Sequence, residues 1–362
     1  MYKDGWTSDI ACALPAEVQD HYWRGGLHPF FEHLGPEGWL RGLQARAGGT
    51  ANQDDFGLLL KFGADCIGAV GIRPADGEIP HTDADPHTLD EAAAVPGRTL
   101  SGVQKKLLAY QDETGFHPAA RLEDPATHIA KFNRDDLPTL VQNERLSLEL
   151  GRQVLGTDEI TKAAVAQLAG FEGIALLVER FDRENGDAQR LEDFAQILEK
   201  PRGREFDGKY DSSYEEAAEA VIRFSARARI DLGRYFALVA FNLVLGNADA
   251  HLKNFSLLER PEGLRLSPAY DLLNTIVYPT YDRSSALAID GRKREFEAID
   301  RPLVEKLGDN LGLPKAAVGQ ILDRLRDRFR NAKALEIGRN VQPDDFRAGW
   351  SETITNNLGR IL

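Results

Sequence analysis

Two short stretches of this chain, GNADAHLKN at 246–254 and LSPAYD at 266–271, decide how it folds and what chemistry it can support. The apolar segment 231–245 lies directly before the first stretch. It has the periodicity of a helix, for which the first glycine of the loop is a natural end. Between the two stretches, 255–258 and 264–267 predict a β-hairpin. The sequence therefore predicts a polar loop between a helix and a hairpin.

The spacing of the polar residues in these stretches is the one that phosphoryl transfer needs. Asn254 follows Asp249 by five residues, and Asp271 follows Asn254 by seventeen. In that chemistry one carboxylate, here Asp249, orients and deprotonates the acceptor hydroxyl, while Asn254 and Asp271 hold Mg²⁺ against the nucleotide phosphates. His251 contacts phosphate, stabilises the loop, or is an ordinary loop histidine with satisfied hydrogen bonds. Asp and Asn after a helix also serve as turn and cap residues, so the pair alone leaves both interpretations open.

Upstream residues supply the remaining parts of such a site in the order that a kinase requires. Ser101 and Gly102 form a small-residue turn, Lys131 lies in a predicted strand at 127–132, and Glu144 lies in the first turn of a predicted helix. A kinase uses these parts to cradle the phosphates, neutralise them and position the lysine. Each part also has an ordinary structural explanation, such as a turn, an edge lysine or a carboxylate favoured by a helix dipole. Their order along the chain favours the kinase interpretation.

The rest of the pattern predicts a small sheet with one helix, followed by a mostly helical region. The apolar strand predicted at 174–178 ends at Glu179 and Phe181, where a two-lobed kinase has its adenine-binding hinge, although an apolar strand running into a charged turn is common. The helix predicted at 143–155 has one apolar stripe, with Asn143 as its cap. Other predicted elements are a helix and a short strand within 56–72, a short helix at 89–94, a helix at 213–227 and several amphipathic helices from Pro302 onward.

Composition excludes several classes of protein. The 362 residues carry 57 acidic and 44 basic side chains, a net charge of −13, and 42% of them are hydrophobic. This composition is that of a globular chain of two domains, or of one large two-lobed domain, and it argues against nucleic-acid binding over the whole surface. Two cysteines, Cys12 and Cys66, cannot form a disulfide framework, and no apolar run is long enough to span a membrane. We expect a soluble cytoplasmic protein.

Two further polar stretches have weaker functional interpretations. His81, Asp83, Asp85 and His87 lie in a segment rich in Pro and Asp. Their spacing matches no zinc template, and a solvated linker is the favoured interpretation. The basic run at 292–294 is either solvated surface or a face for a polyanionic partner.

Together these motifs resemble the HipA-like serine/threonine kinases, the toxin components of bacterial toxin–antitoxin modules. The resemblance runs from about residue 28 to the carboxy-terminus and is most specific at 246–255 and 266–271. The other stretches that carry it are HPFFEHLGPEG at 28–38, GAVGI at 68–72, TLSGVQ at 99–104, THIAK at 127–131, NE at 143–144 and VERFD at 178–182.

The resemblance implies an α+β fold. Its two-lobed protein-kinase-like core has a small β-rich lobe and a larger helical lobe, and a small N-terminal α/β subdomain precedes the core. The expected boundaries are 1–92 for the N-terminal subdomain and linker, 93–182 for the kinase N-lobe and 183–362 for the helical C-lobe. Full-length family members carry a further β-rich subdomain ahead of the part matched here. We therefore expect a shortened, split-type member, with a small separate protein supplying the missing piece.

The resemblance also implies ATP and Mg²⁺ as cofactors and gives roles to individual residues. By position, Asp249 is the catalytic base, Asn254 and Asp271 are the Mg²⁺ ligands, and His251 belongs to the same catalytic loop. The implied ATP-binding positions are Ser101, Gly102, Val103, Gln104, Lys131, Glu179 and Phe181.

Regulation and partners follow from the same resemblance. Family members phosphorylate a serine of their own phosphate loop, which ejects the loop and silences the enzyme; the matching positions are Thr99 and Ser101. The implied partners are a helix-turn-helix antitoxin, through which DNA is reached indirectly, and an aminoacyl-tRNA synthetase as substrate, with no membrane. The expected function is a toxin that halts translation.

Two other functions stay open at this point. A small-molecule phosphotransferase of the antibiotic-kinase type fits the same Asp-to-Asn spacing, and a non-catalytic chain could serve as a co-repressor scaffold for a DNA-binding antitoxin. Labelled ATP discriminates between protein and small-molecule acceptors, and substitution of Asp249 separates a catalytic mechanism from a scaffold.

Overall fold

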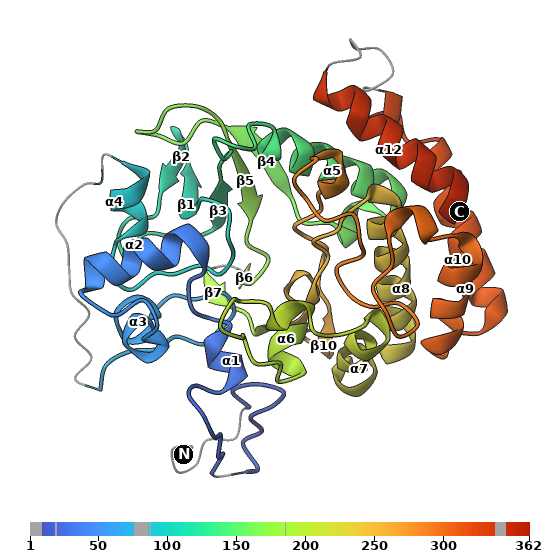
Figure 1. Cartoon of the computed structure of the whole chain (residues 1–362). Helices are drawn as coiled ribbons and strands as arrows, with labels where there is room; N and C mark the ends of the chain where they lie inside the picture. Colours follow the sequence, from blue (N-terminus) through green and yellow to red (C-terminus); the bar gives the residue numbers. More distant parts are fainter. Residues whose placement is uncertain (1–8, 19, 76–85, 87, 185, 337–344) are drawn as a thin grey trace. The chain divides into compact units, whose positions relative to one another are not determined.

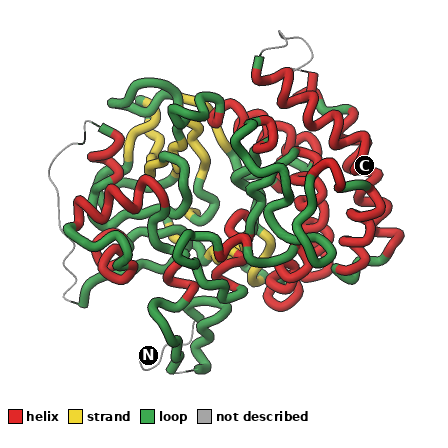
Figure 2. Tube along the Cα trace, viewed as in Figure 1, coloured by secondary structure: helices red, strands yellow, loops and turns green. Residues whose placement is uncertain are grey.

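The chain forms two compact units, which Figure 1 traces in sequence colours. The computed structural model describes residues 9–18, 20–75, 86, 88–184, 186–336 and 345–362. Unit 1 consists of Met1–Val141 and Lys162–Gly208, and unit 2 of Gln142–Thr161 and Lys209–Leu362. Figure 2 shows that the largest sheet belongs to unit 1 and that helices dominate unit 2. This mixed α+β composition agrees with the expected fold class.

A five-stranded antiparallel sheet with the order β2-β1-β3-β5-β4 is the centre of unit 1. Its strands are β1 (Lys106–Asp112), β2 (Gly115–Pro118), β3 (His128–Lys131), β4 (Ala163–Ala166) and β5 (Ala175–Glu179). The first four residues of β5 are all buried, as expected for an apolar strand paired on both edges. The strands predicted at 127–132 and 174–178 are confirmed.

Short helices and strands complete unit 1. They are α1 (Pro29–Glu32), α2 (Gly38–Gly48), α3 (Asp55–Phe62), α4 (Leu89–Ala93), β6 (Arg183–Glu184), β7 (Asp187–Ala188), β8 (Leu191–Asp193) and α6 (Phe194–Ile197). The predicted helix at 89–94 is confirmed, with a Thr88–Glu91 capping box at its start. The short strand predicted after α3 is wrong, because the described residues there make only one isolated bridge, Asp65 to Arg98.

Unit 2 is built on α8 (Ala228–Leu245), a helix whose residues from Tyr235 to Leu245 are nearly all buried. Such a helix is apolar all round because neighbours surround it. Its other helices are α5 (Leu140–Val154, which starts in unit 1), α7 (Tyr214–Phe224), α9 (Arg301–Asn310), α10 (Lys315–Arg330) and α12 (Phe346–Ile361). Of all helices in the described ranges, none combines the length and apolarity needed to cross a bilayer.

The predicted hairpin is present as β9 (Ser256–Arg260) and β10 (Gly263–Leu266), which pair antiparallel. Short 3₁₀ turns connect other parts of the chain, at Thr157–Glu159, Gly208–Tyr210, Leu252–Asn254, Thr275–Val277, Phe296–Ala298 and Lys333–Leu335. The hairpin therefore returns the chain past the end of α8, as the two motif stretches predicted.

The prediction that Asn143 caps a helix is wrong. α5 begins earlier, at Leu140, and Asn143 lies inside it, fully buried. The Asn143 amide donates to the Asn274 carbonyl at 2.9 Å and to the Tyr278 hydroxyl at 3.2 Å. A buried asparagine needs such partners, so its function is to tie α5 to a distant segment rather than to start the helix.

A buried carboxylate fixes the hairpin to α8. Asp231 is fully buried and accepts hydrogen bonds from Arg265 (2.8 and 2.9 Å), Arg234 (2.7 Å), Ser225 (2.6 Å) and the Leu266 backbone (3.1 Å). Burial alone would raise the pKa of Asp231, but the donated hydrogen bonds outweigh it and hold that pKa below its ordinary value.

We predict that Asp231→Asn lowers the free energy of unfolding by about 3 kcal/mol, because it leaves Arg265 without its buried anionic partner. Because the folded pKa is depressed, the contribution of Asp231 is present above about pH 4 and is lost as the pH falls further. Urea unfolding of wild type and variant at neutral and acidic pH measures both effects.

Glu262→Gln is the matched control, because Glu262 pairs with the same arginine from an exposed position. Exposed pairs contribute little, so this variant should unfold at nearly the same urea concentration as wild type. Equal losses from the two substitutions would contradict the role given to Asp231.

Candidate active site

The loop after α8 is anchored to the segment that follows the hairpin. Gly246 ends the helix with φ of 81°, and a Cβ there would lie 2.7 Å from Ile276, so only glycine fits. Its carbonyl accepts from the Thr275 backbone at 3.0 Å and from the Thr275 hydroxyl at 3.3 Å. The same hydroxyl accepts from the Ala248 backbone at 2.7 Å. These contacts set where the next residues lie.

Asn247 is the centre of the loop's hydrogen bonding and is almost fully buried. Its Oδ1 accepts from the Asp249 backbone at 3.1 Å. Its Nδ2 donates to Asn242 Oδ1 at 2.8 Å and to the Asp271 carbonyl at 3.3 Å. One side chain therefore links α8, the predicted base and a predicted metal ligand.

Asn254 is bonded to the predicted base from the other side. Its Nδ2 donates to the Asp249 carbonyl at 2.8 Å, which fixes the orientation of the amide. In the described part of the chain no donor bonds Asn254 Oδ1, so this oxygen is available as a ligand. Asp271 has φ of 52°, an unfavourable conformation for a residue other than glycine, of the kind that clusters at functional sites. Amide and carboxylate oxygens are the donors that Mg²⁺ prefers, and this pair fits it.

The Asp249 carboxylate is 40% exposed and lies against two ring side chains. The Tyr210 hydroxyl donates to Asp249 Oδ1 at 2.5 Å, and His251 Nε2 lies 3.9 Å from the same oxygen. The Tyr210 ring packs edge-on against His251, with 4.9 Å between ring centroids. Tyr214 holds the next residue by donating to the Ala250 carbonyl at 3.2 Å, and burial raises the pKa of Tyr214, so it stays a donor.

The predicted phosphate loop of unit 1 rests on the start of α2. The Ser101 hydroxyl donates to Glu37 Oε1 at 2.7 Å, and Glu37 is buried. Gly38 has φ of 54°, and a Cβ there would lie 2.8 Å from Val103, so the loop approaches the helix closely. Gln104 donates to the Phe132 carbonyl at 2.9 Å, which ties the loop to the end of β3. Gly102 itself has φ of 107°.

The two predicted modification sites differ in exposure. Thr99 is buried, and its hydroxyl donates to Gln44 Oε1 at 2.9 Å. Gln44 is also buried and donates to the Ala93 and Arg98 carbonyls. Ser101 is only partly buried. Thr99 is thus part of a packed polar network, whereas Ser101 lies in the loop.

Three of the remaining predicted residues lie in or next to the sheet of unit 1, and the fourth lies in unit 2. Lys131, at the end of β3, is 5% exposed, and its backbone is paired with β1 and β5. The Glu179 backbone donates to the Lys162 carbonyl, and its carboxylate accepts from Lys162 Nζ at 3.3 Å. Phe181 is half-buried. Glu144 is buried in α5, in unit 2. The joint cleft of the two units therefore stays a prediction.

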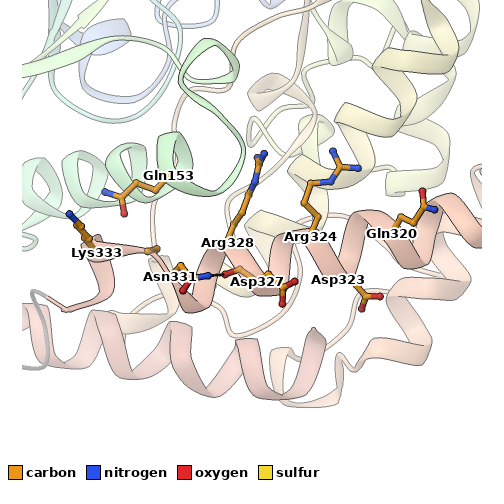
Figure 3. Close-up of a pocket in the computed structure, with 9 residues that line it drawn as sticks. Gln153, Gln320, Asp323, Arg324, Asp327, Arg328, Asn331 and Lys333 are labelled. Carbon is orange, nitrogen blue, oxygen red and sulfur yellow. Dashed lines mark hydrogen bonds between the residues drawn. The ribbon is translucent and has the colours of Figure 1, made fainter.

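A cavity of about 890 Å³ in unit 2 contains none of the predicted site residues. Figure 3 shows Arg324 and Arg328 extending from one side of α10, with Asp323 and Asp327 on the other. Arg328 donates to the Val154 carbonyl at 3.0 Å, which caps the end of α5. None of the kinase motifs in the sequence contributes a residue to this lining, so the Asp249 loop remains the candidate.

Sequence reasoning gave no role to Asn247 and did not consider Tyr210. Asn247 lies within the motif at 246–254, but nothing in the sequence around it indicates that its side chain is buried and links separate segments. Tyr210 lies far from Asp249 in sequence and belongs to a 3₁₀ turn, so no spacing could have found it.

Two other expectations concern metals and charge. Residues 81, 83, 85 and 87 lie outside the described residues. In the described ranges, no group of three or more His, Cys, Asp or Glu side chains is placed to hold a metal ion. The basic run at 292–294 approaches the candidate site, since Lys293 Nζ lies 5.3 Å from the centroid of the Tyr210 ring.

Comparison with known proteins gives a consistent result. The family model of the HipA-like C-terminal domain matches residues 98–333, and that of the HipA N-terminal domain matches residues 1–73. A putative kinase of Sinorhizobium fredii, Y4mE, is 32% identical and aligns over 96% of this chain and 89% of its own length. The expectation that a subdomain is missing ahead of the matched part is not confirmed by these matches.

A toxin and a solved structure are also similar. The serine/threonine-protein kinase toxin HipA of Shewanella oneidensis is 28% identical over 79% of this chain and 71% of its own length. The structure of the Shewanella HipA, HipB and operator DNA complex aligns with a TM-score of 0.73 at 24% identity, covering 92% of this chain and 85% of that one. The fold of this chain is thus shared with that protein.

We predict that Asn247→Ala lowers the free energy of unfolding by about 2 kcal/mol, because it removes the hydrogen-bond partner of the buried Asn242 side chain and of the part-buried backbone groups at 249 and 271. Thermal unfolding measures the effect. Asn310→Ala is the control, since the exposed Asn310 makes one long hydrogen bond of 3.4 Å, and it should leave stability almost unchanged. A wild-type melting curve for Asn247→Ala would show that this link is dispensable.

Proposed function

We propose, from the premise that this chain belongs to the HipA family of kinases, that it is an ATP- and Mg²⁺-dependent serine/threonine protein kinase acting as a toxin. The observation that carries the proposal is the arrangement of the Asp249 loop. The half-exposed Asp249 carboxylate lies on a backbone whose N–H is bonded by Asn247 and whose carbonyl is bonded by Asn254. The side-chain oxygen of Asn254 is then available as a metal ligand.

Asp249 is proposed as the catalytic base. Its backbone N–H is held by Asn247 and its carbonyl by Asn254, so the carboxylate is presented from a rigid loop. It orients the acceptor hydroxyl and takes its proton as the phosphoryl group is transferred. His251 lies close to the Asp249 carboxylate and packs edge-on against the Tyr210 ring, and it supports the loop through these contacts.

Asn254 Oδ1 and the Asp271 carboxylate are proposed as Mg²⁺ ligands, because hard oxygen donors suit that ion. When bound, Mg²⁺ would neutralise the negative charge of the ATP phosphates. On the side of unit 1, the loop from Ser101 to Gln104 is proposed to hold ATP phosphates, and Lys131 to neutralise them. Glu179 and Phe181 are proposed to contact adenine.

The proposed physiological role is that of the family. The similar Shewanella toxin was solved with HipB and operator DNA, which supports an antitoxin partner for this chain and DNA contact only through that partner. We propose that the partner is a helix-turn-helix protein, and that the acceptor is an aminoacyl-tRNA synthetase whose phosphorylation stops translation.

We predict that Asp249→Asn lowers the rate of label transfer from ATP at least 10³-fold, because general-base catalysis contributes about 10²–10⁴ and the charge that orients the hydroxyl is also lost. The loss should leave binding of a non-hydrolysable ATP analogue unchanged, because Asp249 is not among the proposed nucleotide ligands. Labelled ATP with a cell lysate as acceptor measures transfer, and calorimetry measures binding.

Asp282→Asn is the matched control, an exposed aspartate in the same unit, which should keep wild-type transfer. Label on an aminocyclitol rather than on protein would favour a small-molecule phosphotransferase. Growth arrest that persists in Asp249→Asn would instead favour a scaffold that represses through a DNA-binding partner.

Ser101, rather than Thr99, is the proposed site of autophosphorylation. The Thr99 hydroxyl is buried and committed to Gln44, whereas Ser101 is partly exposed and its neighbour Val103 is 56% exposed. A phosphate of about −2 charge on Ser101 would face the buried Glu37 carboxylate, and the repulsion would displace the loop.

We predict that incubation with ATP and Mg²⁺ places phosphate on the peptide containing Ser101, identified by mass spectrometry. Ser101→Ala should carry no label there and keep its transfer activity longer than wild type. Thr99→Val, which removes the other hydroxyl, should be labelled as wild type is. Label on Thr99 in the wild-type chain would overturn this assignment.

A further inference from the structure

Tyr210 contacts the side chain of the proposed catalytic base, whereas the loop's own hydrogen bonds hold its backbone. Its hydroxyl donates to Asp249 Oδ1 at 2.5 Å. Within the described residues this is the one hydrogen bond made to that carboxylate by a side chain, since His251 lies 3.9 Å away. The backbone of Asp249 is fixed by Asn247 and Asn254, but rotation of its carboxylate is restrained by Tyr210.

The ring that carries this hydroxyl is itself restrained. Lys293 Nζ lies 5.3 Å and Lys209 Nζ 5.6 Å from the ring centroid, both within the range of a cation–π contact. His251 packs edge-on against the same ring at 4.9 Å. Two cations and an imidazole therefore hold the ring at the edge of the loop.

The backbone near Tyr210 is also anchored. Tyr210 ends a 3₁₀ turn, and two residues later the Ser212 carbonyl accepts from the Ala288 backbone at 3.0 Å. Ser213 then caps α7, and Tyr214 donates to the carbonyl that follows Asp249 in the loop. Tyr210 and Tyr214 thus reach the loop from one short segment, the first to the carboxylate and the second to the backbone.

We infer that Tyr210 is a positioning residue for phosphoryl transfer, fixing Asp249 Oδ1 so that Oδ2 is left to accept the proton of the acceptor hydroxyl. This inference rests on the proposed function. A carboxylate held by one oxygen keeps one rotamer, and the other oxygen then meets the acceptor at a defined angle. An error of about 1 Å in such a placement costs on the order of 10²-fold in rate.

An opposing role is physically conceivable for the same contact, and it gives the opposite result. If the phenol occupied the place of the acceptor hydroxyl, Tyr210 would inhibit the enzyme and its removal would raise the rate. In a positioning role, removal of the hydroxyl lowers the rate of the chemical step and leaves nucleotide binding unchanged.

The test is Tyr210→Phe, which removes the hydroxyl and keeps the ring that Lys209 and Lys293 contact. We expect the single-turnover rate of label transfer from ATP to the chain, at saturating ATP, to fall about 10- to 100-fold. The ATP concentration that gives half this rate should stay within about twofold of wild type. Calorimetry with a non-hydrolysable ATP analogue counts the folded sites, so a misfolded fraction is not mistaken for slow chemistry.

Tyr281→Phe is the matched control, a phenol in the same unit that the structure places near Tyr278 rather than Asp249, and it should transfer label at the wild-type rate. If transfer depends on Asp249 but Tyr210→Phe equals or exceeds wild type, the inference about Tyr210 is overturned and the proposed function stands. If the wild-type chain transfers no label, or Asp249→Asn retains it, both proposals fail together.

Discussion

The left-handed turn at Gly246 is the constraint on which the candidate site depends. It ends α8, and its carbonyl accepts three hydrogen bonds from Thr275 and Ile276. The chain must therefore leave the helix in one direction, against a segment that follows the hairpin. The next residue, Asn247, bonds to the Asp271 carbonyl and to the Asp249 backbone N–H. The position of Asp249 is therefore fixed through its backbone, independently of the contacts of its side chain. A loop fixed in this way holds the proposed base, Asp249, through backbone hydrogen bonds rather than through exposed side chains.

How much of the fold could be predicted depends on whether a feature is determined by residues close together in the sequence or by contacts between distant ones. The helix that ends at 245, the hairpin and the strands at 127–132 and 174–178 follow from periodicity and turn residues close in sequence, and they are present. Asn143 was misplaced because a polar residue near a helix start is ordinarily a cap, whereas this one bonds residues far along the chain. Local patterns cannot show which buried polar groups will meet.

In the candidate site, too, some residues could be predicted from local sequence patterns and others could not. Asp249, Asn254 and Asp271 could be proposed from their spacing, and a hydrogen-bonded chain through Asn247 connects them. Tyr210 could not be proposed, because its contact with Asp249 is produced by a 3₁₀ turn before α7 that no pattern specifies. Residues that supply charge and metal-binding oxygens have sequence signatures, but the residues that hold them in place do not.

The proposed phosphate loop raises a separate physical question, which is how a loop proposed to hold ATP could also be displaced by the modification proposed at Ser101. Its contacts supply an answer. The loop is held by the Ser101 hydroxyl on the buried Glu37 carboxylate and by close packing of Val103 on Gly38. A hydroxyl donates to a carboxylate, but a phosphate in its place only accepts and carries like charge. The Ser101–Glu37 pair that fixes the loop would then repel it, so the proposed modification would need no separate release mechanism.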